Sequence, residues 1–90
     1  MNKAQLIKRV ARDIRMSRVK AARVIDSLLE HMTRALRKGE RASLVGFGTF
    51  TVARRRARTG RNPQTGEPIR IPARRVVRFT PGKALRSQIR

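Results

Sequence analysis

The amino-acid sequence predicts an α+β fold: a two-helix base, a three-stranded antiparallel sheet with a long β-ribbon arm, and a short C-terminal helix. Three observations indicate it. Apolar residues recur at helical spacing as far as Gly39, and beyond it they alternate with polar residues as they do in strands. Between Val52 and Ile69 the alternation loses its apolar members, with turn-forming residues in the middle of this basic stretch. Apolar alternation then returns, and a short amphipathic segment ends the chain.

Two amphipathic helices with a short connection are expected at the start of the chain. The first runs from Lys3 to about Ile14, with basic side chains away from its apolar stripe. For the second, Ser17 offers a hydroxyl N-cap, and Gly39 suits the left-handed position that follows a helix. The apolar positions are Leu6, Ile7, Val10, Ala11 and Ile14 in the first helix, and Ala21, Ile25, Leu28, Leu29, Met32, Ala35 and Leu36 in the second.

The sheet is expected to begin with two strands joined by a tight turn. Ala42 and Leu44 alternate with polar residues, and Phe50 and Val52 do the same after Gly46-Phe47-Gly48. The two glycines allow the backbone to turn sharply, and because they lack a Cβ they would also let a ligand backbone come close.

The stretch from Ala53 to Arg75 predicts a β-ribbon arm that projects from the sheet. Its two basic legs flank Asn62-Pro63-Gln64-Thr65-Gly66, a cluster of turn formers. A strand without an apolar face has no core to pack on, and legs of about eight to ten residues would reach roughly 26 to 33 Å. Strict alternation places Arg54, Arg56 and Arg58 on one face of the outgoing leg and Arg55, Ala57 and Thr59 on the other.

The chain is then expected to return to the sheet and to end in a helix. Val77 and Phe79 alternate with polar residues in a third strand, and Thr80-Pro81 is typical of an N-cap followed by proline at the first helical position. The single domain of residues 1–90 would divide into a helical dimerisation body of about 1–39, sheet strands of about 41–52 and 76–80, an arm of about 53–75 and a C-terminal helix of about 81–90.

Composition indicates a nucleic-acid partner and association of the chain with itself. The 24 Lys and Arg residues against five Asp and Glu give a net charge of +19, which is explained chiefly by neutralisation on a polyanion. A chain of 90 residues with three Phe and no Trp or Tyr supplies a thin core, and joining two half-cores buries more apolar area. Dimerisation is therefore expected. RNA stays open as a secondary partner, because charge alone does not separate it from DNA.

The same composition argues against catalysis, a metal, a cofactor and a membrane. His31 is the only histidine, cysteine is absent, and the five carboxylates are scattered without forming an acid–base pair. Gly46-Phe47-Gly48 precedes a strand and not a helix, so it does not predict a phosphate-binding loop. No apolar run approaches the ~20 residues of a membrane span, and the first residues lead into an amphipathic segment. We expect a soluble, intracellular protein that is not an enzyme.

Four segments together carry a specific resemblance to a known family. They are Leu44 to Phe50 (LVGFGTF), Arg58 to Gly66 (RTGRNPQTG), Phe79, and Pro81 to Leu85 (PGKAL). On these residues the whole chain resembles the bacterial histone-like HU and integration host factor family. The resemblance implies an intertwined dimer whose arms embrace double-stranded DNA along the minor groove. It also implies largely sequence-independent bending and compaction of chromosomal DNA in the nucleoid of the bacterial cytoplasm.

Residue roles follow from the resemblance and from the basic pattern. Pro63 at each arm tip would be a wedge between base steps, and the dimer core would contain Phe47, Phe50, Phe79, Leu29, Leu36 and Leu44. DNA contacts are expected from Lys3, Gly46, Gly48, Arg54, Arg55, Arg56, Arg58, Arg61, Asn62, Pro63, Gln64, Arg70, Arg74, Arg75, Lys83 and Arg86. Bent, nicked or gapped duplex should bind better, because part of the deformation cost is already met.

Two questions stay open at this point. The segment Ala73-Arg74-Arg75-Val76-Val77 is similar to the alpha subunit of integration host factor, which favours as an alternative a site-specific bender acting in a heterodimer, although a homodimer is the main expectation. Lys3 and Asp26 form either a surface pair worth well under ~1 kcal/mol or, as the resemblance implies, a switch that opens as DNA wraps the flanks.

Overall fold

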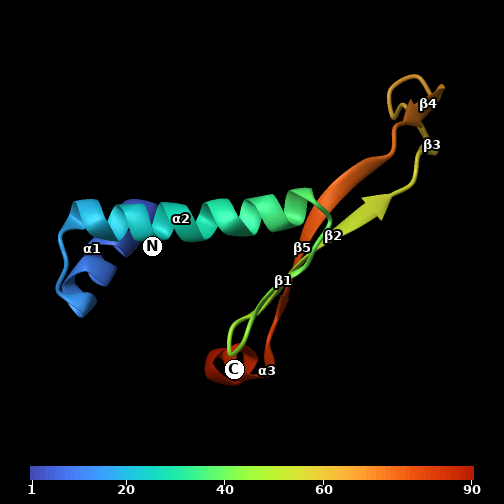
Figure 1. The fold of residues 1–90 in the computed structure, drawn as a ribbon. Helices are drawn as coiled ribbons and strands as arrows, with labels where there is room; N and C mark the ends of the chain where they lie inside the picture. The colour runs from blue at the N-terminus through green and yellow to red at the C-terminus, as the bar shows by residue number, and fades with distance from the viewer. The chain divides into compact units, whose positions relative to one another are not determined.

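The computed structural model describes all of residues 1–90 and contains two compact units, Met1–Ala35 and Leu36–Arg90. The elements, in chain order, are α1 (Lys3–Ile14), α2 (Arg18–Arg37), β1 (Ala42–Leu44), β2 (Gly48–Arg55), β3 (Arg58–Arg61), β4 (Pro68–Ile71), β5 (Arg74–Pro81) and α3 (Lys83–Ile89) (Figure 1). Helices and antiparallel strands follow one another as expected, so the predicted α+β fold class is confirmed.

The helix ends of the first unit are well capped. Asn2 and Gln5 form a capping box at the start of α1: the Gln5 amide donates to Asn2 Oδ1 at 2.9 Å, and the Asn2 amide donates to Gln5 Oε1 at 3.1 Å. Arg15 ends this helix in the left-handed region, with φ at 57°. Ser17 caps α2 as predicted, since its Oγ accepts from the Lys20 amide at 3.1 Å.

The end of α2 also matches the sequence prediction. Gly39 has a φ of +82° and its amide donates to the carbonyl of Leu36 at 3.0 Å. A side chain is strained in this conformation, so glycine ends the helix there at little cost. None of the helices is long and apolar enough to cross a membrane.

The second unit contains a three-stranded antiparallel sheet in the order β1-β2-β5. Its register pairs Phe50 with Phe79 and Val52 with Val77, so these four side chains share one face. The ring centroids of Phe50 and Phe79 are 4.7 Å apart, and those of Phe47 and Phe79 are 5.4 Å apart. An aromatic cluster therefore occupies the apolar face of the sheet.

A short interruption separates this sheet from the arm. The β2–β5 ladder extends to the pair Arg55–Arg74, three pairs beyond Val52 and Val77, and the arm ladder starts again at Arg58–Ile71. The residues between the two ladders, Arg56-Ala57 on one leg and Pro72-Ala73 on the other, belong to neither strand pair. Pro72 has no amide hydrogen to donate, which accounts for the break on its own leg.

The predicted start of the C-terminal helix is wrong. Pro81 is the last residue of β5, where it pairs with Gly48, and α3 begins only at Lys83. The N-cap is Gly82, which makes no side-chain capping bond, and its amide donates to the carbonyl of Phe47 at 2.8 Å. Pairing with β2 and with the β1–β2 turn therefore overrides the local capping signal of Thr80-Pro81.

The chain buries very little apolar surface by itself. Ala11 and Ala21 are the only buried apolar residues, and no large side chain is fully buried. The exposed large apolar residues are Met1, Ile14, Val19, Val24, Leu28, Leu29, Leu44, Val45, Phe47, Ile69, Val77, Phe79 and Ile89. A folded chain of this length normally covers such residues, so they indicate a surface that another subunit would cover.

Candidate nucleic-acid interface

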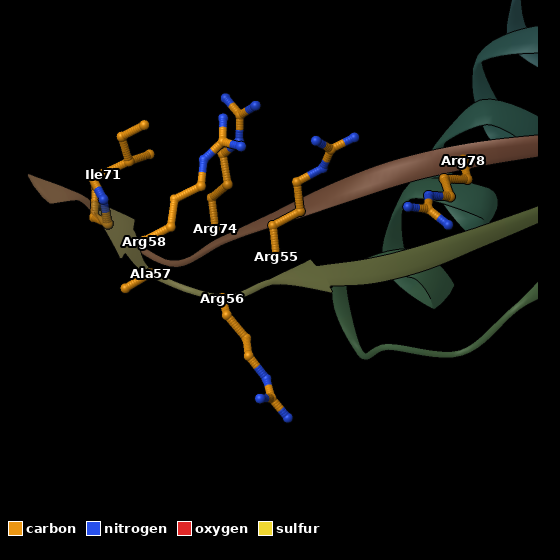
Figure 2. Close-up of a pocket in the computed structure, with 8 residues that line it drawn as sticks. Arg55, Arg56, Ala57, Arg58, Ile71, Arg74 and Arg78 are labelled. Atoms are coloured by element: carbon orange, nitrogen blue, oxygen red, sulfur yellow. The ribbon is translucent and has the colours of Figure 1, made fainter. Parts of the chain in front are cut away.

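Three arginines come together on one side of the junction between sheet and arm. Arg55 and Arg74 are directly paired across β2 and β5. Figure 2 shows their side chains extending to the same side as that of Arg58, while Arg56 extends to the opposite side. They line a hollow of about 420 Å³ together with Arg56, Ala57, Ile71, Pro72 and Arg78. We call Arg55, Arg58 and Arg74 the junction arginines.

The predicted distribution of arginines over the two faces of the outgoing leg is wrong for Arg58. Strict alternation would place Arg58 with Arg54 and Arg56, opposite Arg55. The interruption at Arg56-Ala57 breaks the alternation, so that Arg58 emerges on the side of Arg55 and Arg74 (Figure 2). Side chains alternate strictly only while a strand keeps its pleat.

The junction arginines have no carboxylate nearby. Residues 36–90 contain fifteen Lys and Arg but only two acidic residues, Glu40 and Glu67. The two ion pairs of the chain, Lys3–Asp26 and Arg34–Glu30, both lie outside this part of it. Exposed guanidinium groups without a counter-charge attract anions, and their planar donor pattern fits phosphate oxygens.

The arm continues this basic surface on both of its faces. In the β3–β4 register Arg58 pairs with Ile71, while Thr59 pairs with Arg70 and Arg61 with Pro68. Arg61 and Arg70 therefore share the face opposite Arg58. A ribbon with cations on both faces can be contacted by phosphates from two sides, as in a groove.

The arm tip is a closed turn that holds Pro63 outward. The Asn62 amide donates to the carbonyl of Glu67 at 2.8 Å, and the Gly66 amide donates to the carbonyl of Asn62 at 2.7 Å. The Gln64 amide donates to Asn62 Oδ1 at 2.9 Å, an Asx turn directly around Pro63. Pro63 itself is exposed. The turn therefore presents a rigid apolar ring to whatever the arm approaches.

Arg75 differs from its neighbour Arg74. It pairs with Arg54 on the face opposite the junction arginines, and its Nη2 donates to the carbonyls of Leu36 and Arg37, at 3.0 Å each. The guanidinium thus satisfies two free carbonyls at the end of α2. Sequence reasoning grouped Arg75 with the DNA contacts, because nothing local indicates a partner nearly forty residues away.

The two turn glycines also have different roles. Gly46 is exposed with a φ of +84°, and nothing lies within 4 Å of the position that a Cβ would take. Gly48 is buried, and a Cβ there would lie 2.6 Å from both Phe79 Cε1 and the Thr80 carbonyl oxygen. At Gly48 the missing side chain therefore makes room for Phe79, and the DNA contact expected there stays a prediction.

The other predicted site residues belong to other elements of the chain. Lys3 Nζ lies 2.6 Å from Asp26 Oδ1 in an exposed ion pair, and Lys83 and Arg86 are exposed on α3. Gln64 is exposed at the arm tip. No group of three His, Asp or Glu side chains is arranged to hold a metal ion.

The predicted dimer-core residues are only partly covered by their own chain. Leu29 and Phe47 are each 45% exposed, Phe79 is 41% exposed and Leu44 is 38% exposed. Phe50 and Leu36 are half-buried. Apolar side chains of this size favour burial against a partner by about 1.5 to 3 kcal/mol each when fully covered.

Comparisons with known proteins identify the family of the chain. The chain matches the family described as "Bacterial DNA-binding protein" over residues 1–90. It is 48% identical over 90 residues to the DNA-binding protein HU of Geobacillus stearothermophilus, with all of both chains covered. It is 48% identical over 89 residues to the DNA-binding protein HU-beta of Serratia marcescens, with 99% of each covered.

Solved structures show the same fold. The protein chain in a cocrystal structure of Anabaena HU with DNA superposes with a TM-score of 0.90 at 40% identity, covering 99% of this chain and 97% of that one. HU from Thermotoga maritima superposes with a TM-score of 0.73 at 33% identity, covering all of both chains.

Proposed function

The chain belongs to the bacterial DNA-binding protein family that includes HU, and we propose that it binds and bends double-stranded DNA as an architectural protein. The observation that carries the proposal is the set of junction arginines, which lie on one side of the ribbon without a carboxylate partner. A surface of this kind is suited to a phosphate backbone and carries no sequence information. Binding should therefore depend strongly on salt and weakly on sequence.

The arm would act in the minor groove. Arginine side chains are favoured there because the groove concentrates negative potential, and they respond to groove width more than to sequence. Cations on both faces of the β3–β4 ribbon would face the phosphates of both walls. The junction arginines and Arg61 would make these contacts, with Arg54, Arg56 and Arg70 next to them.

Bending would depend on Pro63. The Asx turn holds this ring outward, so it can enter a base step without first being ordered. Unstacking one step costs a few kcal/mol, which is recovered if the bent duplex touches more of the basic protein. Nicked, gapped or already bent DNA needs less of this energy and should bind more tightly.

A dimer would bring two such arms to one duplex. Val77, Phe47 and Phe79 expose apolar surface on the sheet, and Leu29 exposes it on α2. Covering these side chains with a second copy of the chain supplies the core that one chain lacks. We propose a homodimer acting on the nucleoid in the bacterial cytoplasm.

The test compares binding to an intact and a nicked duplex across a salt series, with the bend measured by energy transfer between dyes at the duplex ends. We expect tighter binding to the nicked duplex and a steep loss of affinity with salt. Arg58→Ala should flatten the salt slope by about 0.9 for each arm that contacts DNA. Arg34→Ala removes the same charge from the ion pair with Glu30 and serves as the control, with an unchanged slope expected.

Three outcomes would contradict the proposal. They are affinity that does not change with salt, a bound duplex that is straight, and displacement of DNA by an equal concentration of double-stranded RNA. A single natural site bound roughly 10³-fold more tightly than random duplex would instead indicate a site-specific bender.

A further inference from the structure

The hollow at the base of the arm spans the break between the two ladders. Its volume is about 420 Å³, within the range of pockets that hold small organic ligands. Arg55 and Arg74 come from the last pair of the β2–β5 ladder, and Arg58 and Ile71 from the first pair of the β3–β4 ladder. Pro72 lines the hollow from the unpaired segment. A ligand in this hollow, which we call the junction hollow, would therefore contact the sheet and the arm at once.

The basic side of the junction hollow has no partner within the protein. Arg55, Arg58 and Arg74 extend to one side of the ribbon (Figure 2). The arginine side chains that donate hydrogen bonds within the chain are those of Arg34 and Arg75, and neither lines the hollow. The junction arginines thus keep their planar donors for an anion. Three guanidinium groups around one hollow suit a chain of linked phosphates better than a single phosphate.

The other side of the junction hollow is apolar and held in place. Ile71 and Pro72 contribute to it, together with Ala57. Ile71 is half-buried and lies close to Gly60, where an added Cβ would be 3.1 Å from Ile71 Cδ1. The proline ring is rigid. An inorganic phosphate gains nothing from these groups, whereas a nucleobase would bury apolar surface against them and can also stack on a guanidinium plane.

We propose that the junction hollow binds a nucleoside triphosphate, and that this nucleotide competes with DNA for the base of the arm. Its phosphate chain would lie on the junction arginines and its base against Ile71 and Pro72. This inference rests on the proposed function, because competition requires that the same arginines hold DNA. A nucleotide bound there would also bridge the two ladders, so it would restrain the arm while blocking it.

The test measures displacement of a fluorescent duplex from the protein by adenosine triphosphate, followed by fluorescence anisotropy at constant ionic strength without divalent cations. Inorganic tripolyphosphate is the matched competitor, since it has the same phosphate chain, more negative charge and no base. Charge alone would make tripolyphosphate the stronger competitor. With its base on the apolar side, adenosine triphosphate should instead act at about a tenfold lower concentration. A tenfold preference corresponds to about 1.4 kcal/mol, which the removal of roughly 60 Å² of apolar surface from water supplies.

Two isoleucine variants test the contact with the base. Ile71→Ser removes part of the apolar side, while Ile69→Ser makes the same change on the same face of the arm but outside the hollow. In Ile71→Ser the two competitors should act at concentrations within about threefold of each other, and in Ile69→Ser the roughly tenfold difference should remain. Because each variant is judged by the ratio of two competitors, a change in its affinity for DNA does not affect the comparison.

Titration of the protein with adenosine triphosphate alone, by calorimetry, tests the phosphate contacts. The variant combines Arg55→Gln, Arg58→Gln and Arg74→Gln, and its control combines Arg9→Gln, Arg12→Gln and Arg23→Gln. The control removes the same charge from exposed positions of the helical unit. The junction variant should bind the nucleotide at least about tenfold more weakly than the parent. The control should bind within about threefold of the parent, because salt screens charges that do not touch the ligand.

These measurements separate this inference from the proposed function. If the parent protein binds no duplex, the proposed function fails, and the titration alone decides whether the hollow binds the nucleotide. If the parent binds duplex and adenosine triphosphate displaces it no better than tripolyphosphate does, this inference fails while the proposed function stands. It also fails if Ile71→Ser keeps the preference, or if both arginine variants lose nucleotide binding equally, since the nucleotide would then bind net charge and not the hollow.

Discussion

Arg74 and Arg75 are adjacent arginines whose replacement should have opposite consequences. The Arg75 guanidinium donates to two carbonyls at the end of α2, both at 3.0 Å, while Arg74 belongs to the junction arginines and has no protein partner. Arg75→Ala leaves those carbonyls without a charged donor. Arg74→Ala removes only a cation from the proposed DNA surface.

The expected cost of Arg75→Ala follows from the two bonds. A hydrogen bond to a charged group contributes about 1.5 to 3 kcal/mol, and the exposure of Arg75 places the pair at the low end, near 1.5 kcal/mol in all. For a chain of this size each kcal/mol shifts the thermal midpoint by about 4 to 8 °C, so a fall of about 6 to 12 °C is expected. Arg75→Lys keeps the charge but not the planar group that spans both carbonyls. Its thermal midpoint should therefore lie between those of the parent and Arg75→Ala.

The expected effect of Arg74→Ala is on DNA binding. A dimer carries two copies of Arg74, and each neutralised phosphate contributes about 0.9 to the salt slope, so the slope should flatten by up to about 1.8. The thermal midpoint should stay within about 4 °C of the parent, since surface substitutions without partners change stability by less than about 0.5 kcal/mol.

The assay is thermal unfolding at equal protein concentration, because association makes the midpoint depend on concentration. Affinity for a random duplex across a salt series is measured on the same samples. The reasoning is refuted if Arg75→Ala leaves the midpoint unchanged, or if both variants flatten the salt slope equally while neither alters stability.

Three further predictions follow from the sheet, the arm tip and the apolar face. Gly48→Ala should destabilise the protein by about 3 kcal/mol in chemical denaturation, because the new methyl group would overlap the Phe79 ring and a backbone carbonyl. In the control Gly46→Ala the methyl group meets nothing, so only the positive φ should cost stability, by about 1 kcal/mol. Equal losses of stability in the two variants would refute the packing argument. Pro63→Ala should reduce the DNA bend and the preference for nicked duplex more than bulk affinity, and an unchanged bend angle would count against the wedge. Val77→Glu should shift the protein towards monomer in sedimentation, since Val77 is 61% exposed on the apolar face, and an unchanged dimer would show that this face is not the interface.

Local signals in the sequence predicted most of the elements. Ser17 and Gly39 mark helix ends through bonds within four residues, so their roles were readable from the chain. The capping box of Asn2 and Gln5 was missed, although the spacing of these residues is its sequence signal. The turn formers around Pro63 likewise predicted the hairpin of the arm.

The errors in the sheet and the arm depend on contacts between distant parts of the chain. The strand continues through Pro81 because it pairs with Gly48, and no residue near Pro81 indicates this. Arg58 changes sides because the ladder breaks before it, and Arg75 caps a helix that ends 38 residues earlier. The sequence pattern shows which side chains alternate. Pairing between distant strands decides where the alternation stops and which residue each strand residue faces.

We expect the unpaired residues between the two ladders to act as a joint at the base of the arm. Arg56-Ala57 and Pro72-Ala73 have no ladder bonds to break, so a swing of the β3–β4 hairpin would leave both ladders intact. In a dimer the two arms would then release DNA one at a time. While one arm holds, the other is tethered at an effective concentration on the order of millimolar and rebinds quickly. A competing duplex or protein that occupies the vacated groove would prevent that return, so dissociation should accelerate as free DNA becomes more concentrated.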